Sequence, residues 1–133
     1  MESDFSKVIY PDLSYKLTGI LFSVHNELGR FCNEKQYADC VEGYFKKLNN
    51  VEYEREKILN PAFEEELPGR NKIDFIIENK IILEIKAKRI LGREEYYQVK
   101  RYLNSTSKKL GIVANFRDRY LRPKRILNSL GVE

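Results

Sequence analysis

The sequence predicts an α/β protein of the α+β-like kind, with a four-stranded mixed β-sheet flanked by helices and the element order α-α-β-β-β-α-β-α. Three observations predict this class. Apolar residues recur at helical spacing near the N-terminus, they alternate or form short runs in the middle, and another helical pattern separates the third predicted strand from the fourth. Three antiparallel strands followed by a helical crossover into a fourth imply a mixed sheet.

Two helices are predicted before the first strand. The second is expected to begin near Asn33, which can act as N-cap while Gln36 completes a capping box, and to end near Leu48. The first is expected to end at Gly29, placed as its C′ residue. Its apolar residues fall at helical spacing: Leu13, Leu17, Ile20, Leu21, Val24 and Leu28.

The period then changes to that of strands. The stretch "VEYEREKIL", residues 51–59, alternates as a half-buried strand does. After a loop around "NPAFEEELPGRN", two apolar runs predict neighbouring strands at Ile73–Ile77 and Ile81–Ala87. These three strands form the predicted antiparallel meander.

The C-terminal part completes the predicted sheet. A third helix fits Arg93 to about Ser105, and Lys109–Phe116 is expected to be the fourth strand. The tail "RDRYLRPKRILNSL" is expected to be a loop followed by a short helix. Since 133 residues suffice to bury one core, a single domain is expected over residues 1–133, with its core at about 13–128.

Composition and charge favour some function classes over others. The net charge is +4, but the stretch from Lys86 to Arg125 holds 13 Lys and Arg against three acids, a local net of +10 that leaves −6 elsewhere. This asymmetry favours a polyanionic partner. Two cysteines make neither a disulfide framework nor a zinc site. No signal peptide or membrane-spanning run is recognisable, so a cytoplasmic protein without a membrane partner is expected.

Charged side chains interrupt the two apolar strands. Asp74 lies in the first, and Glu84 and Lys86 share one face of the second. If "ENK" forms a three-residue connection, Ile77 pairs with Ile81 and Asp74 falls opposite Glu84; a two-residue turn would separate the acids. Hydrophobic matching does not choose between the registers, because both faces carry apolar residues.

Two facing carboxylates need a positive charge between them. Like charges directly opposite on a sheet are destabilising, and more so in a partly dehydrated cleft. A divalent cation such as Mg²⁺ would resolve this, because it binds one or two carboxylates plus waters and phosphate oxygens. Lys86 would then lie beside the ion. The alternative is a half-exposed hairpin in which Glu84 and Lys86 pair as surface charges.

The order Asp74 … Glu84-Ile85-Lys86 resembles the active-site motif of the PD-(D/E)xK nuclease superfamily, an acid on one strand and acid-x-Lys on the next. The element order is similar to the restriction-endonuclease-like core of that superfamily. "QVKRY", with Gln98 and Tyr102, resembles the QxxxY motif of its RecB-like branch. The resemblance extends from about residue 13 to 128.

A further stretch, "VHNELGRFCNEKQY", resembles the opening of the prokaryotic GxxExxY protein family, through Val24, His25, Leu28, Gly29, Glu34 and Tyr37. The sequence departs from that pattern where Phe31 replaces the naming glycine and Arg30 the usual proline. Ile73 stands where a proline often precedes the first acid. Histidine is present at position 25 in that family too, but we expect His25 to be structural, and Tyr37 likewise.

The resemblance implies a metal-dependent nuclease that hydrolyses nucleic-acid phosphodiester bonds, with Mg²⁺ or Mn²⁺ as cofactor. Asp74, Glu84 and the backbone carbonyl of Ile85 would hold the ion, and Glu34 would reach it through a water or else simply favour its helix N-terminus. Lys86 would orient the attacking water, stabilise transition-state charge or accept a proton, and these roles stay open.

Gln98 and Tyr102 share a helix face and would close the site; the alternative places Tyr102 in the core and Gln98 in solvent. A basic tail is expected to contact phosphates, with DNA favoured over RNA. The rival readings are a non-catalytic nucleic-acid-binding module on the same fold, and a chance match in a structural or interaction protein. A homodimer is a further possibility for so small a chain. The residues of the tail concerned are Arg117, Arg119, Arg122, Lys124 and Arg125.

Overall fold

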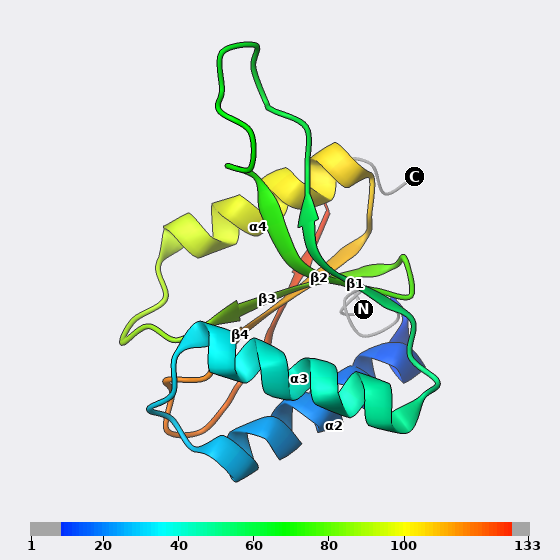
Figure 1. Ribbon diagram of the computed structural model, residues 1–133, viewed down its shortest axis with the longest axis vertical. Coiled ribbons are helices and arrows are strands. Elements are labelled where there is room, and N and C mark those ends of the chain that lie inside the picture. Colours follow the sequence, from blue (N-terminus) through cyan, green and yellow to red (C-terminus); the bar gives the residue numbers. More distant parts are fainter. Residues whose placement is uncertain (1–8, 129–133) are drawn as a thin grey trace, which may run out of the picture.

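The computed structural model describes residues 9–128 and has a five-stranded mixed sheet between two helical layers (Figure 1). Helices α2 and α3 cover one face, and α4 covers the other. The α/β class and the helix-flanked mixed sheet are confirmed. The elements are α2 (Pro11–Leu28), α3 (Glu34–Leu48), β1 (Tyr53–Ile58), β2 (Lys72–Ile77), β3 (Ile81–Lys86), α4 (Arg93–Thr106), β4 (Leu110–Asn115) and β5 (Lys124–Leu127).

The predicted final helix is wrong over residues 124–127, which form β5 beside β4. A short run such as "KRIL" fits a helix or a strand equally well by periodicity. Its tertiary partner decides: β4 offers an open edge, and Ile126 packs into the core under α4. The sheet therefore has five strands rather than four. Residues 129 and 130 of the predicted helix lie outside the described residues.

Helix α2 ends and helix α3 begins where the sequence predicts. Gly29 terminates α2 with φ of +76°, a conformation that favours glycine. Asn33 caps α3, with its side chain accepting from the Gln36 N–H while Gln36 accepts from the Asn33 N–H, so the capping box is confirmed. Helix α2 begins before Leu13, because Pro11 occupies its first turn.

Strand order along the sheet is β1-β2-β3-β4-β5, with β3 and β4 parallel and the other pairs antiparallel. The turn between β2 and β3 sets the register, because Glu78 and Asn79 both have positive φ and the Lys80 N–H donates to the Ile77 carbonyl. Ile77 accordingly pairs with Ile81, the register that brings the two acids together. The loop of residues 59–71 projects from the body (Figure 1).

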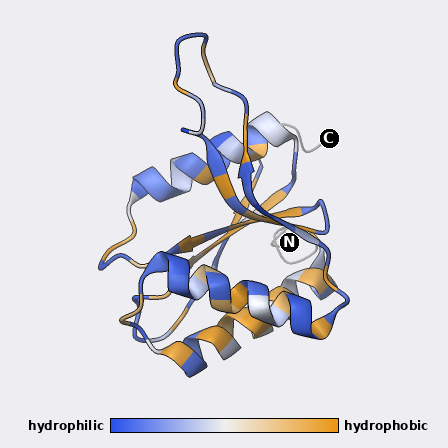
Figure 2. Cartoon of the chain, in the orientation of Figure 1, coloured by the Kyte–Doolittle hydropathy of each residue, from blue (hydrophilic) through white to orange (hydrophobic). Residues whose placement is uncertain are grey.

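Two apolar cores lie on opposite faces of the sheet. The larger is shared with α2 and α3, and the smaller with α4. Apolar residues gather along the sheet and in α2, whereas α4 and the projecting loop are mostly hydrophilic (Figure 2). Of the helices formed by residues 9–128, none is long and apolar enough to cross a bilayer.

Gly111 in β4 allows α4 to approach the sheet. A Cβ added there would lie 2.5 Å from Val99 Cγ1, and Val99 is a fully buried, stiff side chain. We expect Gly111→Ala to lower the free energy of unfolding by about 2 kcal/mol, because α4 must shift. Gly43→Ala, inside α3 with nothing within 4 Å, should instead raise it slightly. Urea titrations measure both. Equal stability of the two variants would contradict this account of the packing.

Candidate functional site

The two predicted acids meet where backbone pairing between β2 and β3 stops. The backbone pairing ends at Phe75 with Leu83, so Asp74 and Glu84 are the next positions of the same register. Here hydrogen bonds from backbone to side chain replace the backbone bonds between the strands. The Asp74 N–H donates to Glu84 Oε2 (3.0 Å), and the Ile85 N–H donates to Asp74 Oδ2 (2.7 Å). The reciprocal bonds hold the two carboxylates next to each other.

The strand carrying Asp74 does not alternate regularly. Strict alternation predicts Ile73 on the same face as Phe75, yet Ile73 packs in the core under α4 while Phe75 packs in the other core. In the neighbouring strand, Glu56 has φ of +56°, an unfavourable conformation for a residue other than glycine. Regular alternation would group Asp74 with Ile76, opposite Ile73 and Phe75, and the strand does not keep this arrangement. Asp74 instead borders a cavity beside α3.

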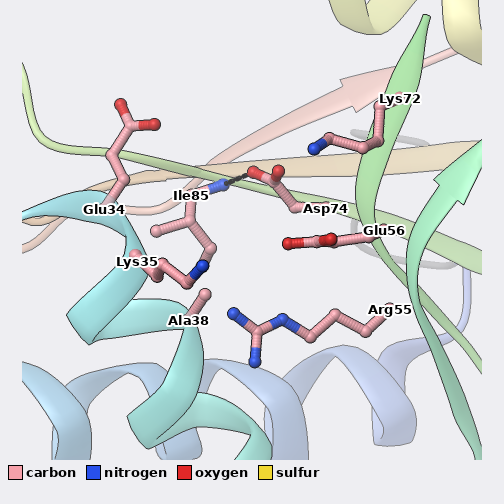
Figure 3. Close-up of a pocket in the computed structure, with 8 residues that line it drawn as sticks. All are labelled: Glu34, Lys35, Ala38, Arg55, Glu56, Lys72, Asp74 and Ile85. Carbon is pink, nitrogen blue, oxygen red and sulfur yellow. Dashed lines mark hydrogen bonds between the residues drawn. The ribbon is translucent and has the colours of Figure 1, made fainter. Parts of the chain in front are cut away.

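This cavity has a volume of about 280 Å³ and a charged lining (Figure 3). Side chains from β1 and β2 point across it toward α3. The cations of this site were not predicted from the sequence. Lys72 lies two residues from Asp74 on β2, a spacing that places it on the same face as that acid. The lining residues are Glu34, Lys35, Ala38, Arg55, Glu56, Lys72, Asp74 and Ile85.

Burial and nearby negative charge raise the pKa values of both acids. Burial raises the pKa of Glu84 to about 8, with the nearby Asp74 carboxylate adding to the rise. Burial likewise raises the pKa of Asp74, and Glu34 acts in the same direction. The Lys86 ammonium and the backbone N–H bonds oppose both shifts. Ionising both carboxylates is therefore unfavourable unless a further positive charge is present.

Lys86 and Gln98 meet on the α4 side, where Lys86 Nζ donates to Gln98 Oε1 at 3.2 Å. Tyr102, one helical turn further, is 2% exposed and packs in the core with Val99 and Leu103. Burial raises the pKa of Tyr102, and the Glu84 carboxylate adds to this. Gln98 thus contacts a candidate catalytic group, whereas Tyr102 combines a core position with proximity to Glu84.

Glu34 stands in the first turn of α3 and accepts the Ala87 N–H at 3.2 Å, so it touches the end of β3 just beyond Lys86. His25 and Tyr37 have structural contacts: His25 Nε2 lies 2.9 Å from the Asp118 carbonyl, and the Tyr37 hydroxyl donates to the Gly29 carbonyl at 2.6 Å. Their contacts agree with the structural roles expected for them.

The carboxylate oxygens of Asp74 and Glu84 are ligands of the type that a divalent cation such as Mg²⁺ binds. One oxygen of Asp74 and one of Glu84 accept backbone N–H groups, while the second oxygen of each accepts no hydrogen bond within residues 9–128. Mg²⁺ can be held by two carboxylates if waters and phosphate oxygens complete its shell. In the described part of the chain, no three acidic, histidine or cysteine side chains are close enough to hold a metal without such additional ligands.

The predicted phosphate-binding tail divides in two. Arg119, Arg122 and Lys124 are exposed. Arg125 is partly buried and bonds Ser14 and the Ile9 carbonyl, which ties β5 to the start of α2. Arg117 is also partly buried, with its guanidinium over the Phe31 ring.

The mixed sheet lies between two helical layers, and an acid-x-lysine strand stands beside a second acid. These features are typical of nuclease-type domains with a restriction-endonuclease-like core. A model of the PD-(D/E)XK nuclease superfamily matches residues 11–126, nearly the whole chain, and the chain belongs to this superfamily. Its members are mostly nucleases and generally use divalent metals such as Mg²⁺. No curated protein and no solved structure matches the chain.

Proposed function

We propose that the chain is a metal-dependent nuclease that hydrolyses nucleic-acid phosphodiester bonds at Asp74, Glu84 and Lys86. The observation that carries this proposal is the reciprocal bonding of Asp74 and Glu84, which holds two carboxylates with raised pKa values side by side next to an ammonium. Membership of the superfamily gives the reaction class.

Asp74, Glu84 and the Ile85 carbonyl would hold Mg²⁺ or Mn²⁺, with Glu34 acting through a water. When bound, the ion polarises the scissile phosphate and lowers the pKa of a water. Lys86 is placed to orient that water or to stabilise charge that develops on the phosphate, and Gln98 fixes the ammonium through its Oε1. Tyr102 supports α4 behind the acids.

Two cations of the cavity are suited to the substrate's phosphates. Arg55 is already neutralised, because its Nη1 lies 2.8 Å from Asp39 and 2.7 Å from Glu42. Lys35 and Lys72, by contrast, form no salt bridge within residues 9–128, and both line the cavity with Asp74. They would bind phosphate oxygens next to the scissile bond, with Arg119, Arg122 and Lys124 contacting the strand further away.

The motif with Gln98 and Tyr102, and that with Glu34 and Tyr37, support placing the chain in the RecB-like branch and the GxxExxY family. DNA is the favoured substrate over RNA. A single-domain cytoplasmic enzyme, acting as a monomer or a homodimer, completes the proposal.

The test is to incubate the protein with labelled single- and double-stranded DNA and RNA in the presence of Mg²⁺, Mn²⁺ or EDTA. Cleavage with a metal and none in EDTA is the expected result. Calorimetric titration with Mn²⁺ distinguishes this enzyme from the rival non-catalytic module. The enzyme should bind Mn²⁺ at a site that Asp74→Asn removes, whereas the non-catalytic module should show no such site. Absence of both cleavage and Mn²⁺ binding would reject the proposed function.

A further inference from the structure

An exposed phenylalanine beside the candidate site has two guanidinium groups within cation–π distance of its ring. Phe31, in the loop between α2 and α3, is 75% exposed. Arg30 Cζ lies 5.1 Å from the centre of its ring, and Arg117 Cζ, from the segment between β4 and β5, lies 5.3 Å from it. Single exposed apolar residues are common, but an exposed aromatic ring contacted by two cations from separate loops is a specific arrangement.

The arrangement is held by bonds around the ring. Arg30 Nε donates to the Arg117 carbonyl at 2.9 Å, which fixes one loop to the other. The Tyr37 hydroxyl donates to the Gly29 carbonyl and accepts the Cys32 N–H, so both ends of the Phe31 loop are fastened to α3. Arg117 Nε is buried without a hydrogen-bond partner within residues 9–128, so it contributes no hydrogen bond of its own. The ring is therefore positioned before any ligand arrives.

Residues next to both loops also contact the end of the strand that carries Lys86. The Phe116 N–H, next to Arg117, donates to the Lys86 carbonyl at 2.9 Å. Glu34, three residues after Phe31, accepts the Ala87 N–H. A nucleotide chain bound at the candidate site would therefore pass near this end of β3, to which both neighbours of the Phe31 ring are bonded.

The chemistry around the ring indicates its ligand. Arg119 and Arg122 are exposed on the same segment as Arg117, and the Arg119 guanidinium lies 5.3 Å from the ring centre of Tyr120, which is 70% exposed. Aromatic faces alternating with cations suit unpaired bases and their phosphates. Bases of a duplex are already stacked on one another and present no free face to a protein ring.

We propose that Phe31, with Arg30 and Arg117, is a stacking platform that binds an unpaired base of single-stranded nucleic acid next to the candidate site. This inference rests on the proposed nuclease function for its class of ligand. It adds a preference for single strands, or for frayed ends and loops, that the acid pair alone does not specify.

Fluorescence anisotropy in EDTA tests the platform without cleavage. Probes are a labelled single-stranded DNA oligonucleotide, the duplex of the same sequence, and a single strand of equal length with abasic sites. Phe31→Ala should weaken binding of the normal single strand by about tenfold, because stacking of one base is lost. Binding of the duplex and of the abasic strand should change by less than about twofold, since phosphate contacts remain. Phe31→Trp should restore affinity.

Phe63→Ala is the matched control, because Phe63 is 60% exposed in the projecting loop and away from the site. It should bind all three probes as the unaltered protein does. The platform is rejected if Phe31→Ala binds the normal single strand normally, if it loses the abasic strand equally, or if the unaltered protein binds no single strand. Metal-dependent cleavage and Mn²⁺ binding are scored separately. Phe31-dependent binding of the single strand without either of them rejects the nuclease and keeps the platform. Cleavage without Phe31-dependent binding keeps the nuclease and rejects the platform.

Discussion

Lys86→Ala is expected to reduce Mg²⁺-dependent cleavage by roughly a hundred- to a thousandfold, because it removes the ammonium beside the acid pair that would stabilise charge on the phosphate. Mn²⁺ binding should survive, since both carboxylates and their backbone bonds remain. Asp74→Asn should lose cleavage and Mn²⁺ binding together. Initial cleavage rates with saturating metal, paired with calorimetric Mn²⁺ titrations, measure the two effects separately.

Lys47→Ala is the control for loss of a positive charge, since Lys47 is exposed near the end of α3. Its cleavage rate should stay within about twofold of the unaltered protein, as surface charges of this kind contribute little. Circular dichroism spectra that coincide for all variants exclude unfolding as the cause. Full activity of Lys86→Ala would contradict the role assigned to its ammonium.

The sequence predicted the fold well where local signals and tertiary packing agree. The capping box at Asn33 and Gln36 and the glycine stop at Gly29 are local, and the structure has both. The register of β2 and β3 required one extra condition, a three-residue turn, which residues 78–80 supply through positive φ at Glu78 and Asn79. The placement of Asp74 opposite Glu84 follows from that turn.

Other features depend on partners that a linear pattern does not reveal. Residues 124–127 became a strand because β4 had an open edge, whereas their own periodicity was ambiguous. Arg125 resembled its basic neighbours in sequence but is used within the fold, bonded to Ser14. Lys35 and Lys72 come to one cavity from α3 and β2, and no spacing within either element predicts that meeting.

The free energy of unfolding of the metal-free protein is expected to fall as pH rises, and Glu84→Gln should abolish most of this fall. In the folded chain the pKa of Glu84 is about 8, against an ordinary value of 4.5. Between these values the folded state keeps a proton that the unfolded state has released. The folded state then binds more protons, so the free energy of unfolding falls with rising pH across this window. At about 1.4 kcal/mol per pKa unit, the full fall amounts to several kcal/mol.

The glutamine variant carries no titrating proton at position 84, and its amide oxygen can still accept the Asp74 N–H. Urea titrations in EDTA should therefore give similar stabilities for both proteins near pH 5 and a more stable variant above pH 8. Asp74 still titrates in the variant, so some pH dependence remains. Glu64→Gln, an exposed change in the projecting loop, should follow the unaltered protein. Parallel profiles for Glu84→Gln and the unaltered protein would contradict the raised pKa.

With Mg²⁺ present, the unaltered protein rather than Glu84→Gln should have the higher free energy of unfolding at high pH. A cation held by Asp74 and Glu84 requires deprotonated carboxylates, so metal binding releases protons and strengthens as pH rises toward 8. The unaltered protein should thus gain stability from Mg²⁺ most strongly at high pH, where its metal-free form is weakest. Glu84→Gln should gain much less. The buried Glu84 carboxylate that destabilises the metal-free protein would thus give the site its affinity for the ion. The proposed reaction needs that ion.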